Sequence, residues 1–183
     1  MMKLTNISLM EEKTGRYLVE NLSLTINDTT KLAIIGEEGN GKSSLLQVIR
    51  NKQELIPYLH VSGDVQSSYQ TIGYLNQSLI EEQEDLIVAD LFENVEWDEI
   101  LTNAMAAFQI DNLYSEQLYK ELSGGEQLKY QILATLAKNP DLLLLDEPTN
   151  NLDIAGIQWL EDFLLNLSIP VIFVSHDEAF IQK

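Results

Sequence analysis

Apolar and polar residues alternate in short runs along the first third of the chain. Residues 3–9 and 19–26 follow the period-two pattern of half-buried antiparallel strands. Residues 31–35 form a continuous apolar run instead, as buried strands do. Two further strands are predicted at residues 58–65 and 71–75.

Most apolar residues in the rest of the chain recur at helical spacing, and two continuous apolar runs interrupt them. Apolar strands that alternate with helices indicate a parallel sheet covered by helices on both faces. The helices are predicted at residues 44–51, 87–95, 97–108, 126–138 and 154–166, and the buried strands at residues 141–145 and 171–174.

We therefore expect an α/β fold with a mostly parallel sheet, flanking helices and an N-terminal antiparallel β region. The length of 183 residues suits one such domain. Residues 1–77 and 139–183 would form its core. Residues 78–138 would form a helical subdomain that is inserted into the sheet.

The chain is strongly acidic, with 29 Asp and Glu residues, 11 Lys and Arg residues and a formal net charge of −18. Clustered basic residues, which bind nucleic acid through its phosphates, are not visible. Eleven acidic residues and no Lys or Arg lie between Glu81 and Tyr119. We interpret this stretch as a solvated acidic helical face, and a docking surface for a basic partner is the alternative.

Several classes of protein are excluded by composition. The chain has no cysteine, so it has neither disulfides nor thiol chemistry. Its N-terminal residues lack the basic and apolar regions of a signal peptide. The densest apolar run, residues 142–145, is far too short to cross a bilayer. We therefore expect a soluble, cytoplasmic protein.

Residues 36–43 read GEEGNGKS and fit the pattern G-x-x-x-x-G-K-[ST] directly after the apolar run. In this strand–turn–helix order, backbone N–H groups point at phosphate oxygens, and the helix N-terminus adds partial positive charge. Lys42 would reach the β- and γ-phosphates, and the Ser43 hydroxyl would bind Mg²⁺. The plain alternative is a glycine turn with a solvated lysine.

Four leucines at residues 142–145 lead into Asp146 and Glu147. Ligand chemistry sits at the carboxyl ends of the strands in a parallel sheet, so both carboxylates would emerge beside the glycine-rich loop. Asp146 suits an Mg²⁺ ion shared with Ser43, and Glu147 would polarise an attacking water. A capped strand end before Pro148 is the alternative.

Two more polar residues follow predicted strands. His176 comes after the apolar run at residues 171–174, and it would lie near the γ-phosphate and the water held by Glu147. Gln77 comes after the strand at residues 71–75, and its amide oxygen would serve Mg²⁺ or the water. Taken alone, a histidine at a strand end is usually structural, and Gln77 would be an ordinary surface residue.

The segment from Leu122 to Gln127 reads LSGGEQ and has the form of a helix start. Ser123 would be the N-cap, and the N–H groups of Gly124 and Gly125 would face an anion. Simple capping is the alternative. Because the chain already has one phosphate-binding loop, a second such feature suggests a contact with the nucleotide of another molecule.

Together these segments resemble the nucleotide-binding domain of the ATP-binding cassette (ABC) superfamily over essentially the whole chain. The order of the segments, with the signature before the Walker B strand, is highly specific. The resemblance rests on a Walker A loop at residues 36–43, a Q-loop at Gln77, a signature at residues 122–127, a Walker B strand at residues 142–146, a catalytic glutamate at Glu147, a D-loop at residues 151–153 and a switch histidine at His176.

The resemblance implies a P-loop NTPase fold of ABC type that uses Mg²⁺ to hydrolyse ATP to ADP and phosphate. It implies that Glu147 and His176 are catalytic and that Ser43, Gln77 and Asp146 bind the metal. Tyr17 stands where the family places an aromatic side chain on adenine, although packing in a hairpin is nearly as good a reading. The implied contacts to ATP are Tyr17, Gly36, Gly39, Asn40, Gly41, Lys42, Ser43, Ser44, Gln77, Ser123, Gly124, Gly125 and Gln127.

In the ABC family, two such domains pair head to tail. Each ATP is held between the Walker A loop of one domain and the signature of the other; ATP closes the pair and hydrolysis opens it. The implied partner is a second nucleotide-binding domain, in the same chain or in a homodimer. An isolated chain should therefore bind ATP better than it hydrolyses it.

Residues 147–153 read EPTNNLD and resemble the ABC-F group more than transport ATPases. ABC-F proteins are soluble tandem-domain proteins that act on ribosomes, several of them in antibiotic resistance. We expect an ABC-F-like ATPase domain with the ribosome as a partner. The alternatives are the ATPase subunit of a transporter with a separately encoded permease, and a nucleotide-dependent interaction module with negligible turnover.

Two departures from the ABC-F pattern stand out. The chain has one nucleotide-binding domain instead of two, and it stops seven residues after His176, so we expect the first domain of a longer protein. The 45 residues between Gln77 and Ser123 leave no room for the helical arm of many members. The acidic composition gives no support to direct RNA contact by this piece.

Overall fold

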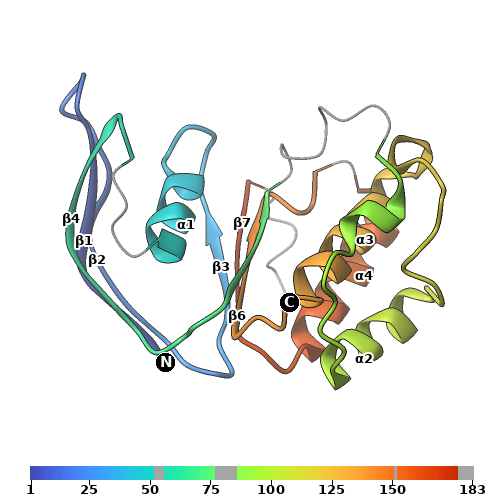
Figure 1. Ribbon diagram of the computed structural model, residues 1–183. Coiled ribbons are helices and arrows are strands. Elements are labelled where there is room, and N and C mark those ends of the chain that lie inside the picture. The colour runs from blue at the N-terminus through green and yellow to red at the C-terminus, as the bar shows by residue number, and fades with distance from the viewer. Residues whose placement is uncertain (52–55, 77–85, 151, 177–183) are drawn as a thin grey trace.

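The computed structural model describes residues 1–51, 56–76, 86–150 and 152–176. Figure 1 shows an antiparallel sheet on one side, a helix beside it, a parallel sheet in the middle and a group of helices on the far side. Among the described residues, no helix combines the length and the apolar composition that crossing a membrane requires.

The N-terminal strands form the antiparallel sheet that the sequence predicts. Its strands are β1 (Met2–Glu11), β2 (Tyr17–Ile26) and β4 (Leu59–Ser67), in the order β2-β1-β4. The register of β1 against β4 shifts between Thr5 and Ser8. Such a shift is typical of a β-bulge, and the three residues Ile7 to Leu9 are all buried.

The second sheet is fully parallel and holds four strands. In chain order they are β3 (Lys31–Ile35), β5 (Ile72–Asn76), β6 (Leu142–Asp146) and β7 (Val171–Ser175), and in space they lie in the order β3-β7-β6-β5. Every residue of β6 is buried, as expected for a central strand covered on both faces. The predicted α/β class is confirmed.

Helix α1 (Lys42–Asn51) lies between the two sheets, as Figure 1 shows. Its apolar face packs into one buried cluster with β1 of the antiparallel sheet and with Leu144 and Val174 of the parallel sheet. The helix begins two residues before the predicted start, so its first turn follows the glycine-rich loop directly. The packing fixes the loop against both sheets.

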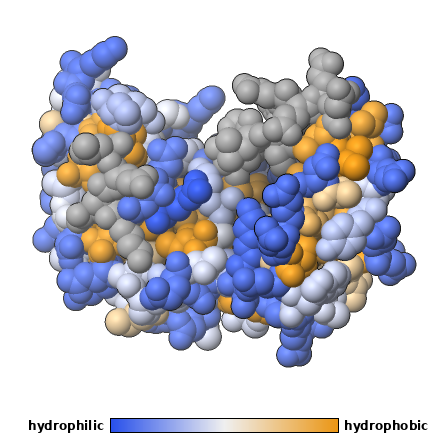
Figure 2. All heavy atoms as spheres, viewed as in Figure 1, coloured by the Kyte–Doolittle hydropathy of each residue, from blue (hydrophilic) through white to orange (hydrophobic). Residues whose placement is uncertain are grey.

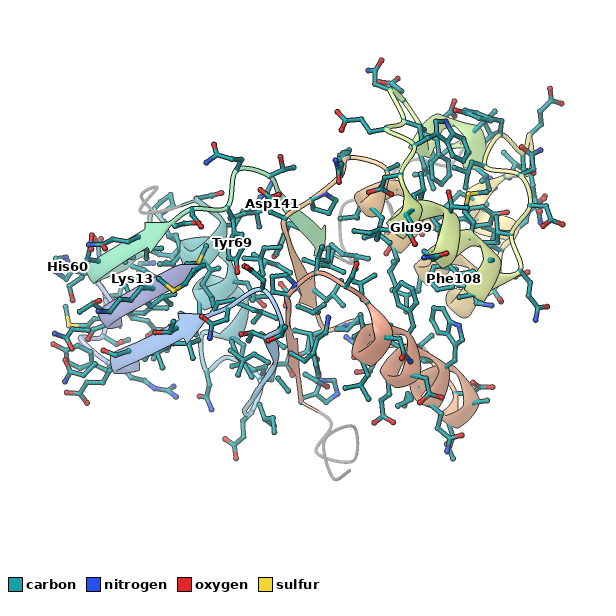
Figure 3. All side chains as sticks on the ribbon, turned by 90° about the horizontal axis from the view of Figure 1, so that it is seen from below. Lys13, His60, Tyr69, Glu99, Phe108 and Asp141 are labelled. Atoms are coloured by element: carbon teal, nitrogen blue, oxygen red, sulfur yellow. The ribbon has the colours of Figure 1, made fainter. Side chains whose placement is uncertain are left out.

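Helices α3 (Gly124–Leu136) and α4 (Ile154–Asn166) lie on the opposite face of the parallel sheet, and α2 (Glu99–Phe108) packs against them on the outer side. Phe108 of α2 contacts both Trp159 and Phe163 of α4, with ring centroids 4.8 and 4.6 Å apart. In Figure 3, Phe108 extends from the end of α2 towards α4. These aromatic contacts tie α2 to the helices that cover the sheet.

The prediction of a helix at residues 87–95 is wrong. Only a short 3-10 turn, η2 (Val88–Leu91), forms in this segment. Val88 and Ala89 donate backbone hydrogen bonds to residues 117 and 115 instead, and Asn94 adopts a φ of 54°. A second 3-10 turn, η3 (Tyr119–Glu121), precedes α3. The division into a core and a subdomain at residues 78–138 stays a prediction.

Candidate active site

The carboxyl ends of β3, β6 and β7 meet at one edge of the parallel sheet. Ile35 of β3 pairs with Ser175 of β7, and Val174 of β7 pairs with Asp146 of β6. The segments that follow these strands are the glycine-rich loop, Glu147 and His176. The topology therefore brings together three parts of the chain that are far apart in sequence, as expected for an open parallel sheet.

The glycine-rich loop depends on backbone conformations that favour glycine. Gly39 and Gly41 have φ angles of 77° and 78°. A Cβ atom on Gly41 would lie 2.8 Å from the Cβ of Leu18 in β2, which is too close for any side chain. The loop is thus packed directly against the antiparallel sheet, and glycine is required there for both conformation and space.

The buried side chain of Lys42 forms hydrogen bonds with the backbone of the glycine-rich loop. Only 8% of its side chain is exposed, and Nζ donates hydrogen bonds to the carbonyl oxygens of Gly36 at 2.7 Å and Glu37 at 2.9 Å. Nζ also lies 3.6 Å from Oε1 of Glu147. A buried ammonium needs such partners, because an unpaired charge away from water is very costly.

Ser43 and Asp146 form a pair of oxygen donors beside Lys42. The Ser43 hydroxyl donates to Oδ1 of Asp146 at 2.8 Å, and the Tyr74 hydroxyl donates to Oδ2 at 3.0 Å. Burial, followed by the charge of Asp146, raises the pKa of Tyr74 well above its ordinary value. Tyr74 therefore stays protonated and remains a donor.

A hydroxyl and a carboxylate on adjacent elements suit a hard divalent cation such as Mg²⁺. The part of the chain that the structure describes contains no group of three or more His, Cys, Asp or Glu side chains fit to hold a metal. Ser43 and Asp146 supply two oxygen donors, and at nucleotide sites phosphate and water usually supply the other ligands of Mg²⁺.

Glu147 and His176 form the third part of the site. Nδ1 of His176 lies 2.8 Å from Oε2 of Glu147, and the His176 backbone N–H donates to the same oxygen at 3.2 Å. Glu147 has a φ of 48°, in the left-handed region that glutamate rarely adopts. Such strain costs on the order of 1–3 kcal/mol and is typical of functional positions.

An open cavity of about 770 Å³ adjoins these groups. It is wide enough for a ligand of nucleotide size. Tyr58 and Leu18 lie on its wall as well. The predicted site residues that line it are Gly39, Gly41, Lys42, Ser43, Ser44, Glu147 and His176.

Tyr17 lies beside this cavity instead of lining it. A neighbouring hollow of about 600 Å³ is bordered by Tyr17, Gly36, Asn40 and Lys42, and Tyr17 is 52% exposed. The preceding residue, Arg16, donates from Nη2 to the Asn40 side-chain oxygen at 2.9 Å. The start of β2 is therefore attached to the glycine-rich loop.

The start of α3 lies outside both hollows. Ser123 is its N-cap: the Glu126 N–H donates to Oγ at 3.3 Å, while the Ser123 N–H and hydroxyl donate to Oε2 of Glu126 at 2.8 and 2.6 Å. These hydrogen bonds lower the pKa of Glu126. Gln127 donates to the carbonyl oxygens of Tyr119 and Leu122 and holds the preceding turn.

The structure thus brings together five of the predicted groups, and it leaves the signature segment, residues 122–127, apart from them. Gln77 and Asn151 lie outside the described residues. Sequence reasoning missed Tyr74. A tyrosine near the carboxyl end of a buried strand was the available signal, because a buried Tyr hydroxyl usually finds a partner. The groups brought together are Lys42, Ser43, Asp146, Glu147 and His176.

Comparison with known families supplies the decisive observation. Residues 19–150, more than half of the chain, match the family described as ABC transporter. The chain belongs to the ABC transporter family. It is an ATPase domain of this family, and its cofactors are ATP and Mg²⁺.

The curated relatives agree with this membership and with the resemblance to the ABC-F group. ATP-binding protein Uup of Buchnera aphidicola subsp. Schizaphis graminum is 36% identical over 179 residues, which cover 91% of this chain and 28% of that protein. The ribosome protection protein VmlR of Bacillus subtilis is 32% identical over 170 residues, which cover 92% of this chain and 30% of that protein. The chain thus spans less than a third of either relative.

Solved structures confirm the fold. The dimeric structure of MJ0796, a bacterial ABC transporter cassette, superimposes with a TM-score of 0.70 at 22% sequence identity. The match covers 98% of this chain and 90% of that one. The ABC ATPase fold predicted from the sequence is therefore correct.

Proposed function

We propose that ATP binds in the cavity beside the glycine-rich loop and is hydrolysed there by the groups that the three strand ends carry. The observation that carries this proposal is the assembly of Lys42, the Ser43–Asp146 pair and the Glu147–His176 pair at one sheet edge. Each group has the chemistry that phosphoryl transfer to water needs, which is positioning and charge stabilisation.

The oxygen donors of Ser43 and Asp146 would hold Mg²⁺ together with the phosphates, and Gln77 is the third proposed ligand. When bound, the metal neutralises the developing phosphate charge. Lys42 would exchange the carbonyl oxygens of Gly36 and Glu37 for phosphate oxygens. Its buried position makes it a preorganised charge.

Glu147 would orient the attacking water and accept its proton. His176 holds Oε2 of Glu147 through its backbone N–H and stands beside the same oxygen through Nδ1. The other carboxylate oxygen, Oε1, faces Lys42. The carboxylate is therefore fixed from two sides, as a general base must be when its geometry determines the rate.

We further propose that the chain works as a head-to-tail pair. Ser123, Gly124, Gly125 and Gln127 would contact the nucleotide bound to the partner domain, and Tyr17 would stack on adenine. The location of the signature segment away from the cavity supports a role towards a second molecule. The similar cassette MJ0796 is a dimer, which also supports this arrangement.

Two settings are consistent with such a pair. We favour a cytoplasmic ABC-F-like protein that acts on the ribosome, because VmlR is a ribosome protection protein and TlrC of Streptomyces fradiae is a tylosin resistance protein. Serving a separately encoded permease is the second candidate, since the family description and the similar cassette refer to transporters.

Two substitutions test the proposed chemistry. Glu147→Gln should retain ATP binding and lower the hydrolysis rate about 10²-fold or more, because it removes the proton acceptor. Lys42→Ala should weaken ATP binding about tenfold or more through loss of a charged hydrogen bond. Calorimetric titration and phosphate release measure the two effects. Unchanged hydrolysis in Glu147→Gln would remove that residue from its proposed role.

The setting is tested separately. Glu147→Gln protein, loaded with ATP, should sediment with purified ribosomes in the ABC-F setting, and the wild-type chain with ADP is the matched control. Sedimentation with neither form would exclude ribosome binding by this chain. A wild-type chain that binds ATP but shows no turnover at high concentration would favour the interaction module over the ATPase role.

A further inference from the structure

The carboxylate of Asp146 accepts hydrogen bonds from two hydroxyl groups, one on a helix and one on a neighbouring strand. Ser43 in the first turn of α1 donates to Oδ1 at 2.8 Å, and Tyr74 in β5 donates to Oδ2 at 3.0 Å. Asp146 itself is 8% exposed. Ser43 belongs to the proposed metal ligands, whereas Tyr74 has no part in the proposed chemistry.

The register of the sheet explains how Tyr74 reaches Asp146. Strands β5 and β6 run parallel, with Tyr74 opposite Leu144 and two residues before the level of Asp146. Side chains two residues apart share a face of a strand. Tyr74 and Leu144 both contribute to the cluster around α1, so the tyrosine ring lies on the α1 side and extends along the strand.

Helix α1 also fixes the ring itself. The guanidinium carbon of Arg50, in the last turn of α1, lies 4.9 Å from the centre of the Tyr74 ring. Arg50 and Ser43 are about 10 Å apart along the helix axis. The first turn of α1 therefore contacts the carboxylate directly through Ser43. Its last turn contacts the ring of Tyr74, whose hydroxyl in turn contacts the carboxylate.

We propose that Tyr74 is a positioning residue: its hydroxyl occupies Oδ2 of Asp146 and turns Oδ1 towards Ser43 and the Mg²⁺ that accompanies ATP. This inference rests on the proposed function. Carboxylates that bind metals are commonly held by a hydrogen bond from a neighbouring group, and removal of that group typically costs 10–100-fold in metal affinity or activity. Without Tyr74, Asp146 keeps its charge but loses the constraint on its rotation.

The experiment measures how much Mg²⁺ improves ATP binding. The dissociation constant of ATP is determined by calorimetry in Mg²⁺ and in EDTA for the wild-type chain and for Tyr74→Phe. We expect Tyr74→Phe to lose about tenfold of the improvement due to Mg²⁺ and to bind ATP in EDTA as the wild type does.

Tyr69, which is labelled in Figure 3, provides a matched control; it lies on the segment between β4 and β5. Its hydroxyl donates to Oδ1 of Asp28 at 3.1 Å, so Tyr69→Phe also removes a Tyr–Asp hydrogen bond. Asp28 is not part of the site. Tyr69→Phe should therefore leave the improvement due to Mg²⁺ unchanged, even where it lowers the melting temperature.

A double mutant keeps the test independent of general destabilisation. In an Asp146→Asn background the metal ligand is already impaired, so adding Tyr74→Phe should cause little further loss. Full additivity would overturn the inference, as would an unchanged Mg²⁺ effect in Tyr74→Phe or an equal loss in Mg²⁺ and EDTA. A wild-type chain that binds no ATP would instead refute the proposed function on which the inference rests.

Discussion

Gly63 and Gly15 both have φ angles in the left-handed region, 101° and 67°, but only Gly63 is crowded. A Cβ atom on Gly63 would lie 2.5 Å from the carbonyl oxygen of Asn6, whereas nothing lies within 4 Å of one on Gly15. Gly63 sits where the register of β1 against β4 shifts. The bulge therefore requires glycine for space as well as for conformation.

Gly63→Ala should destabilise the chain more than Gly15→Ala. Alanine at Gly15 costs only the left-handed conformation, about 1 kcal/mol. At Gly63 a clash with backbone is added, which brings the loss to about 3 kcal/mol or more. Urea unfolding of both variants measures the difference. Equal losses would mean that the close approach to Asn6 does not matter.

The placement of single residues was predicted well where a local spacing pattern determines it, whereas their roles stay predictions. Lys42, Ser43 and Asp146 lie together as expected. The glycine-rich loop and the buried strand can each be recognised from consecutive residues of the sequence. Tyr74 was missed. Its contact with Asp146 depends on which strand pairs with β6 and on the register of that pairing. The local sequence pattern determines neither.

At the scale of the element, α3 begins with a reciprocal cap in which Ser123 and Glu126 donate to and accept from each other. The Ser123 hydroxyl, followed by its backbone N–H, lowers the pKa of Glu126. A lowered carboxyl pKa means that the folded state holds its proton less tightly than the unfolded chain does. The resulting stabilisation is present above the ordinary glutamate pKa and disappears as the pH falls below it.

The free energies of unfolding of Glu126→Gln and of the wild type should therefore differ less in acid than at neutral pH. Gln keeps the reciprocal cap but does not titrate. The wild type should have the higher free energy of unfolding at neutral pH, and the two values should converge as the pH falls below about 4.3. Urea unfolding at both pH values measures this. A difference that does not change with pH would contradict the role of the Glu126 charge.

Elements with a long, regular pattern were predicted almost to the residue, as α4 shows. The segment at residues 87–95 failed for a physical reason. Its apolar residues have a spacing that suits a helix, but the N–H groups of Val88 and Ala89 donate to the carbonyl oxygens of residues 117 and 115, which lie beside them only in the folded chain. A short apolar run cannot distinguish these outcomes on its own.

At the scale of the whole molecule, the net charge of −18 opposes association of two copies. Figure 2 shows hydrophobic residues in several patches among hydrophilic ones on one face. A proposed pair of such domains must approach through this mutual repulsion. The repulsion is long-ranged at low salt and is screened as salt is added.

ATP-dependent pairing of Glu147→Gln protein should therefore strengthen with salt. Raising the ionic strength from about 0.1 M to about 1 M shortens the screening length from about 10 Å to about 3 Å. Sedimentation velocity should show more dimer at the higher value, with ADP-loaded protein as the monomeric control. A dimer that dissociates with added salt would indicate that attractive charge pairs dominate the interface.

The order of strands in the parallel sheet has a consequence for biosynthesis. Strand β3 precedes the glycine-rich loop, and among the described strands its one partner is β7, the last of them in the sequence. Translation proceeds at roughly 5–20 residues per second, so the delay between the emergence of these two strands is on the order of ten seconds. Throughout this interval β3 is without the strand that pairs with it in the folded structure.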